Sequence, residues 1–95
     1  LLASSAASDV YKRQKQNIQN GLNFAKKALV TGQCDMLVLD EVLGLVKEGM
    51  ATEDRILEVL QAKSLYTDVI LTGRDSLPRV FDMADNILNI VPEKV

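Results

Sequence analysis

The six residues Met36 to Glu41, MLVLDE, decide the fold of this chain. Four apolar residues in a row, instead of an alternation of apolar and polar ones, predict a strand that is buried on both faces of a parallel sheet. Asp40 and Glu41 follow directly and are expected where this strand leaves the core. Because parallel strands are joined by helical crossovers, helices and further strands should alternate on either side of this stretch.

The residues after the acidic pair predict two helical stretches. The first runs on from Val42 until Gly49 interrupts it. Thr52 is then expected to cap a second helix, with the acidic residues 53 and 54 at its positively polarised end. This helix should bury the apolar residues Ile56, Leu57, Val59 and Leu60.

Further downstream the pattern predicts two more strands and a short helix between them. Val69 to Leu71 form a second continuous apolar strand, and Asp75 or Ser76 is expected to cap a helix that carries Pro78 in its first turn. Residues 87–91 predict a third strand. The order strand, helix, strand, helix, strand, preceded by a helix, predicts an α/β domain with an open parallel sheet.

Upstream, apolar residues recur at helical spacing in residues 15–31, and Gly32 is expected to end this helix. Its buried face should consist of Ile18, Leu22, Ala25 and Leu29. Residues 1–14 show no such periodicity and resemble the translation of a sequencing-adapter remnant. We therefore interpret residues 1–14 as a non-native leader, the alternative being a frayed native terminus, and residues 15–95 as the C-terminal part of a single domain. The bulky apolar residues expected in the core are Phe24, Met36, Phe81 and Met83.

Composition excludes several classes of function. The net charge is −2 without a basic run, so neither nucleic acid nor an anionic membrane is an expected partner. No apolar stretch approaches the ~20 residues of a membrane span. The chain has no histidine and a single cysteine, Cys34, which excludes a zinc site or a Cys–His pair. These features predict a cytoplasmic protein whose chemistry depends on carboxylates, hydroxyls, lysines and arginines.

Two polar clusters follow the first two predicted strands. Asp40-Glu41 has the form of a Walker B segment, in which strand-end carboxylates hold Mg²⁺; alternatively the pair only caps the next helix. Thr72-Gly73-Arg74 lets the backbone approach a ligand and offers a guanidinium to phosphate oxygens; alternatively it is a turn with a solvated arginine. Because ligands bind beyond the carboxyl ends of parallel strands, we expect both clusters at one edge of the sheet.

The segments CDMLVLDE, DVILTGR and MADNI, in this order, resemble the C-terminal half of the ATP:corrinoid adenosyltransferases over residues 15–95. The resemblance implies a partial P-loop, RecA-like domain and an enzyme of cobalamin biosynthesis or salvage. Such enzymes transfer the 5′-deoxyadenosyl group of ATP to the Co(I) of a reduced corrinoid. The resemblance also implies that Asp40 and Glu41 belong to the Mg²⁺-ATP site. It further implies that Thr72, Gly73 and Arg74 face the triphosphate. No catalytic residue is assigned. The oligomeric state stays open, with a homodimer among the options.

This chain departs from the family pattern in several respects. Asp75 stands where the family usually has a glycine, and no GNGKGKT-like phosphate loop occurs, so the chain is expected to be a fragment that is inactive alone. A two-component receiver domain, phosphorylated on Asp40 and assisted by Thr72, is one alternative. Another is a different P-loop ATPase, in which Glu41 would orient a hydrolytic water.

Overall fold

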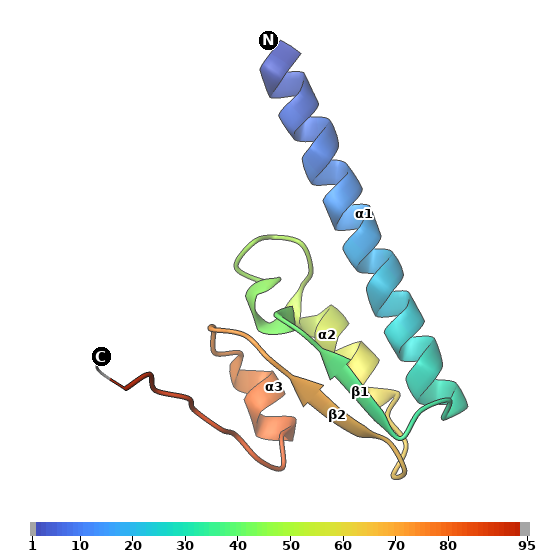
Figure 1. The fold of residues 1–95 in the computed structure, drawn as a ribbon. Coiled ribbons are helices and arrows are strands. Elements are labelled where there is room, and N and C mark those ends of the chain that lie inside the picture. The colour runs from blue at the N-terminus through green and yellow to red at the C-terminus, as the bar shows by residue number, and fades with distance from the viewer. Residues whose placement is uncertain (1, 94–95) are drawn as a thin grey trace.

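The computed structural model describes residues 2–93, with side chains from Asp9 onward. Helix α1 (Leu2–Thr31) is followed by strand β1 (Met36–Leu39) and the short 3₁₀ helix η1 (Val42–Gly44). Helix α2 (Glu53–Gln61), strand β2 (Asp68–Leu71) and helix α3 (Pro78–Met83) complete the fold. Within the described residues the sheet has two parallel strands, whose register pairs Met36 with Asp68 and Leu39 with Leu71. The predicted α/β class with parallel pairing is confirmed (Figure 1).

Helix α1 confirms the predicted face and the predicted stop. Leu22, Ala25 and Leu29 are buried, and Ile18 packs against the same core. The helix ends because Gly32 adopts a left-handed conformation with φ 65°, which a residue without Cβ enters at little cost. The Gln33 N–H then donates to the Ala28 carbonyl over 3.2 Å, closing the last turn.

Helix α1 begins at Leu2, so residues 2–14 are helical although their sequence shows no helical periodicity. This segment is rich in Ala, Leu, Lys, Arg and Gln, which favour a helix even without an apolar stripe. Its helix projects beyond the rest of the fold (Figure 1). Val10 and Tyr11 stay largely exposed, yet the Tyr11 hydroxyl donates to the Gly49 carbonyl over 3.2 Å. The segment interpreted as a leader thus contacts the loop before α2 through this bond.

The core lies between the helices and one face of the sheet. Helix α2 packs against both α1 and α3, and its residues Ile56 and Val59 are fully buried. Thr52 caps α2 as predicted, since its hydroxyl accepts the Arg55 N–H over 3.1 Å. From the strands, the partly buried side chains that pack against this core are Leu37, Leu39, Val69 and Leu71.

The other face of the sheet is open in the described part of the chain, so the prediction of strands buried on both faces is wrong. Met36 is 55% exposed and Val38 is 54% exposed. Continuous apolar residues permit burial on both faces, but no element of residues 2–93 covers the second one. Three residues predicted to be core are in fact exposed, namely Phe24, Met36 and Met83, whereas Phe81 packs against the core.

Three further expectations are wrong. The stretch after Asp40-Glu41 forms the 3₁₀ helix η1 and turns instead of an α-helix. The residue at the N-cap of α3 is Leu77, and neither Asp75 nor Ser76 caps the helix. Residues 87–91 are no strand: they run away from the sheet, and Leu88 and Ile90 are almost fully exposed (Figure 1). A strand needs a hydrogen-bonding edge, and within residues 2–93 no strand lies beside this segment.

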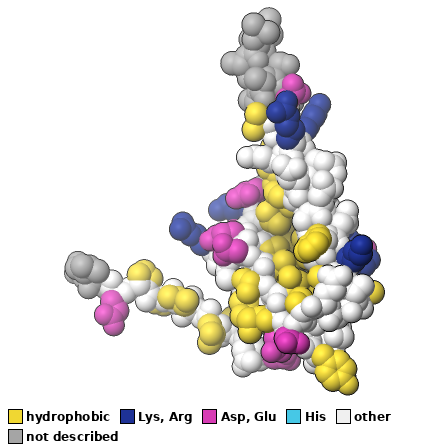
Figure 2. Space-filling view, turned by 45° about the vertical axis from the view of Figure 1, so that its right-hand side comes forward, with side chains coloured by type: hydrophobic (Ala, Val, Ile, Leu, Met, Phe, Trp, Pro, Cys, Tyr) yellow, Lys and Arg dark blue, Asp and Glu magenta, His cyan; other side chains and the backbone are white. Residues whose placement is uncertain are grey.

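Apolar side chains therefore reach the surface in several regions. Figure 2 shows them along the middle of the molecule and again at intervals along the C-terminal segment. None of the helices among the described residues is sufficiently long and apolar to cross a membrane.

Candidate functional site

The ends of the two strands lie side by side. The Thr72 N–H donates to the Leu39 carbonyl over 3.2 Å, which continues the β1–β2 ladder one residue beyond β2. Asp40 and Glu41 follow Leu39 directly, so the register brings these two residues next to Thr72. The structure thus brings together the two polar clusters singled out in the sequence, at the carboxyl edge of the sheet.

The Thr72 hydroxyl joins the two clusters. It accepts the Glu41 backbone N–H over 2.8 Å and donates to Asp40 Oδ1 over 2.7 Å. A bond from a hydroxyl to a carboxylate is charge-assisted and stronger than one between neutral groups. The Leu43 N–H also donates to the Thr72 carbonyl, over 3.3 Å. The loop after β1 is therefore held to the end of β2 by both side-chain and backbone bonds.

Two unusual backbone positions mark this contact. Glu41 adopts a left-handed conformation with φ 58°, and it is the one non-glycine residue with positive φ in the described chain. Gly73 passes directly against Leu43, because a Cβ added to Gly73 would lie only 2.5 Å from the Leu43 Cβ. A side chain at position 73 would push the two loops apart, so glycine is required for this close approach.

The side chains around this contact offer charges of both signs. The side chains of Glu41 and Arg74 are exposed, and Arg74 forms no ion pair with any side chain in residues 9–93. The Asp75 carboxylate lies beside Gly44, since a Cβ on Gly44 would be 3.4 Å from Asp75 Oδ2. The edge thus combines carboxylates with one exposed guanidinium.

The donor set of Asp40 and Glu41 fits a magnesium ion that arrives with a nucleotide. Mg²⁺ is typically held by one or two carboxylates together with water and substrate phosphates, and not by an all-protein cage. Within the described residues, no group of three or more His, Cys, Asp or Glu side chains is placed to hold a metal ion. The two carboxylates would supply the protein's share of the ligands.

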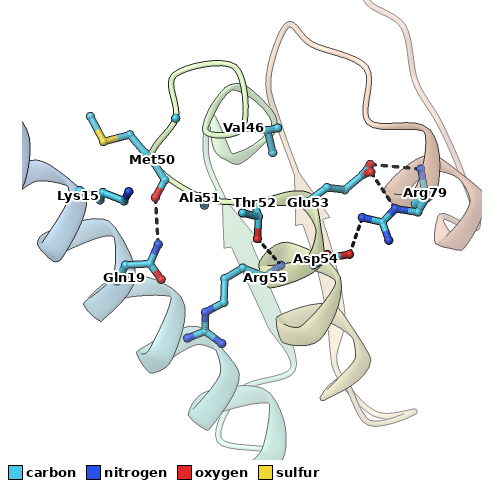
Figure 3. A pocket seen from close by; sticks show the side chains of 11 residues that line it. Lys15, Gln19, Val46, Met50, Ala51, Thr52, Glu53, Asp54, Arg55 and Arg79 are labelled. Carbon is cyan, nitrogen blue, oxygen red and sulfur yellow. Dashed lines mark hydrogen bonds and ion pairs between the residues drawn. The ribbon is translucent and has the colours of Figure 1, made fainter.

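A separate cavity of about 650 Å³ lies between α1, the loop before α2 and the beginnings of α2 and α3. Figure 3 shows Lys15 and Gln19 of α1 on one side and Arg79 of α3 on the other. Gln19 Nε2 donates to the Met50 carbonyl over 2.9 Å, which ties α1 to the loop. None of the five residues predicted as a site lines this cavity.

Both arginines that line this cavity are paired with carboxylates. Arg79 forms ion pairs with Glu53 (2.9 Å) and Asp54 (2.6 Å), and the hydrogen bonds that it donates to Glu53 first, then to Asp54, raise the pKa of its guanidinium. Arg55 likewise pairs with Glu58 and bonds to Asn23. Sequence analysis missed Arg79, because its partners lie 25 and 26 residues upstream and leave no local signal. With both arginines already paired, the strand-end cluster, which consists of Asp40, Glu41, Thr72, Gly73 and Arg74, is the better candidate for chemistry.

Comparison with known proteins identifies the family. The family model described as ATP:corrinoid adenosyltransferase BtuR/CobO/CobP matches residues 4–95. The chain belongs to this family. The resemblance found in the sequence is thereby confirmed, and it reaches further upstream than residue 15. The match includes residues 4–14, whose origin as a leader stays a prediction.

One curated protein with a similar sequence comes from Nostoc sp. (strain PCC 7120) and is described as uncharacterized. It is 31% identical to this adenosyltransferase-family chain over 65 residues, which are 68% of the chain and 17% of the Nostoc protein. The chain thus corresponds to about a sixth of that relative's length. No solved structure matches the chain.

Proposed function

We propose that this chain is the metal-side half of a corrinoid adenosyltransferase, with its strand-end cluster facing Mg²⁺-ATP. The observation that carries the proposal is the bond network around Thr72, which joins the acidic pair to the Thr72–Arg74 loop at the carboxyl edge of the sheet. Open parallel sheets bind their ligands at this edge. The family match supplies the type of reaction.

In this proposal the residues of the cluster act together on one triphosphate and neutralise its negative charge. Asp40 and Glu41 would hold Mg²⁺, which neutralises negative charge on the phosphates, and Arg74 would pair with phosphate oxygens through its forked guanidinium. When the 5′-deoxyadenosyl group moves to Co(I), the bond between C5′ and oxygen breaks and triphosphate leaves with the electron pair. Positive charge at the triphosphate stabilises this leaving group, and the fixed strand ends keep the charges in position.

Other parts of the enzyme would complete the site. We propose a P-loop, RecA-like architecture in which a phosphate-binding loop of the GNGKGKT type joins this edge, in a cytoplasmic protein that can form a homodimer. Such a loop is lacking in the 95 residues, and we therefore expect the chain alone to be inactive. The open sheet face and the unpaired residues 87–91 agree with further contacts in a longer protein.

Two conservative substitutions in the full-length enzyme test the assignment. Glu41→Gln keeps the size and removes the charge, so the steady-state rate of adenosylation should fall at least tenfold, about 1.4 kcal/mol of transition-state stabilisation. Arg74→Lys should also lower the rate, because an ammonium cannot reproduce the forked contact. Asp82→Asn serves as the matched control, since it removes one exposed charge from α3 and should leave the rate unchanged.

The outcomes separate the candidate functions. Thermal melting should show little change in either variant, because both side chains are exposed. Near-normal turnover of both Glu41→Gln and Arg74→Lys would contradict the site assignment. Uptake of a phosphoryl group on Asp40 from a small phosphodonor would instead support the receiver-domain alternative.

A further inference from the structure

We infer that Thr72 is a positioning residue: its hydroxyl sets the geometry of the acidic pair and is not a ligand of the triphosphate. This inference rests on the proposed function and refines it, because Thr72 was expected to face the nucleotide together with Gly73 and Arg74.

Every polar function of Thr72 is directed to the segment from Leu39 to Leu43. Its N–H donates to the Leu39 carbonyl, and its carbonyl accepts the Leu43 N–H. Its hydroxyl oxygen accepts the Glu41 N–H, and the hydroxyl proton is donated to Asp40 Oδ1. These directions are unambiguous, since a backbone N–H can only donate and an ionised carboxylate can only accept.

This arrangement leaves the hydroxyl without a proton for a phosphate oxygen. Phosphate oxygens accept hydrogen bonds, so a residue that binds them must donate, and a hydroxyl has a single proton to donate. Thr72 already uses this proton in its hydrogen bond to Asp40, in which Oγ1 and Oδ1 are 2.7 Å apart. Arg74, by contrast, has five N–H donors and no ion-pair partner in residues 9–93. We therefore assign the contact with phosphate to Arg74, whereas Thr72 holds the Asp40 carboxylate and the Glu41 backbone.

The conformation of Glu41 shows what Thr72 stabilises. Left-handed backbone is unfavourable for a residue that carries a Cβ, and it persists where surrounding contacts hold it. Glu41 has φ 58°, and its backbone N–H donates a hydrogen bond to Thr72 Oγ1. The hydroxyl therefore fixes the backbone of Glu41 and the carboxylate of Asp40 at once. In this way the hydroxyl orients Asp40 and Glu41 where they follow the end of β1.

Thr67, which directly precedes β2, provides a comparison with Thr72 within the same structure. The Thr67 hydroxyl donates to the Cys34 carbonyl over 2.9 Å and so ties the beginning of β2 to the loop before β1. Thr67 is 1% exposed and lies at the opposite end of the strand, away from any predicted site residue. It also ties β2 to the chain beside β1, but its hydroxyl bonds to a backbone carbonyl and not to a carboxylate. Thr67→Val is therefore a matched control for loss of a structural bond between the strands.

The test compares Thr72→Val, Thr72→Ser and Thr67→Val in the full-length enzyme. Hydrogen exchange of the Glu41 amide, measured by NMR, reports the bond directly and needs no activity. It should accelerate in Thr72→Val and return towards the wild-type rate in Thr72→Ser. The Mg²⁺ concentration that half-saturates ATP binding should rise about tenfold in Thr72→Val, the loss expected when a bond to a charged group is removed.

Thr72→Ser should keep the half-saturating Mg²⁺ concentration within about threefold of wild type, because it retains the hydroxyl. Thr67→Val should lower the melting temperature and leave the Mg²⁺ dependence unchanged. Thr72 is only partly buried, so its variants are expected to fold, and Thr72→Ala replaces Thr72→Val if the latter does not.

The results distinguish the inference from the proposed function. An active wild-type enzyme whose Thr72→Val variant keeps its Mg²⁺ dependence would overturn the positioning role and leave the proposed function standing. If the wild-type enzyme does not adenosylate corrinoids, the proposed function fails. If Glu41 amide protection is then lost in Thr72→Val and not in the other two variants, the hydrogen bond between the Glu41 N–H and the Thr72 hydroxyl is still established. Equal loss of Mg²⁺ affinity in Thr67→Val would overturn the inference, because a general loss of strand order would explain it.

Discussion

Replacing Gly73 by alanine should separate the two loops that form the strand-end cluster. The new Cβ would lie 2.5 Å from the Leu43 Cβ and 3.2 Å from the Leu43 Cα, far inside van der Waals contact. Leu43 is buried, and the nearest atoms belong to its backbone and the base of its side chain, so it cannot turn away. Gly73 also has φ 156°, which L-residues rarely adopt. Overpacking and backbone strain together should lower the free energy of unfolding by about 2–4 kcal/mol.

Gly21→Ala is the matched control, since it adds the same methyl group elsewhere. Gly21 lies inside α1 and has nothing within 4 Å of an added Cβ. Alanine is the better helix former, so this variant should gain about 0.5–1 kcal/mol. The measurement is urea denaturation of the full-length protein, in which the midpoint should fall for Gly73→Ala and rise for Gly21→Ala.

A double variant sharpens this prediction. Leu43→Ala retains the Cβ that lies 2.5 Å from the added methyl group, so it should not rescue Gly73→Ala. It should lower stability further through the lost buried side chain. An unchanged midpoint for Gly73→Ala, or rescue by Leu43→Ala, would refute the close approach of these two loops.

Two further predictions concern the chain as a whole and its surface. Residues 1–95 alone should not convert a Co(I) corrinoid and ATP to the light-sensitive adenosyl product, and any such conversion would contradict the fragment interpretation. Hydrogen bonds from Lys26, over 2.8 Å, and then from Arg55 hold the pKa of Glu58 below its ordinary value of 4.5. Lys26→Met should therefore raise this pKa, as an NMR titration of the carboxyl group would show, and an unchanged value would exclude the pair. Because the folded-state pKa is lowered, the stability due to the pair is present above pH 4.5 and is lost as the pH falls through the folded-state pKa.

The sequence by itself determined those features that depend on residues one or two helical turns apart. The spacing of Leu22, Ala25 and Leu29 predicted the buried face of α1, and Thr52 predicted the beginning of α2. Both depend on interactions between residues a few positions apart, which the residue types alone specify. The proximity of Asp40 to Thr72 was also predictable, because parallel strands have their carboxyl ends at one edge.

Only the tertiary structure decided which surfaces and hydrogen-bonding edges find partners. The apolar residues of MLVL and of residues 87–91 indicate a capacity for burial, but burial requires elements that lie far away in the sequence. The same holds for Arg79, whose partners are on α2, and for the direction in which the Thr72 hydroxyl donates. These features depend on the relative placement of segments about thirty residues apart, and residue types along the chain do not encode that placement locally.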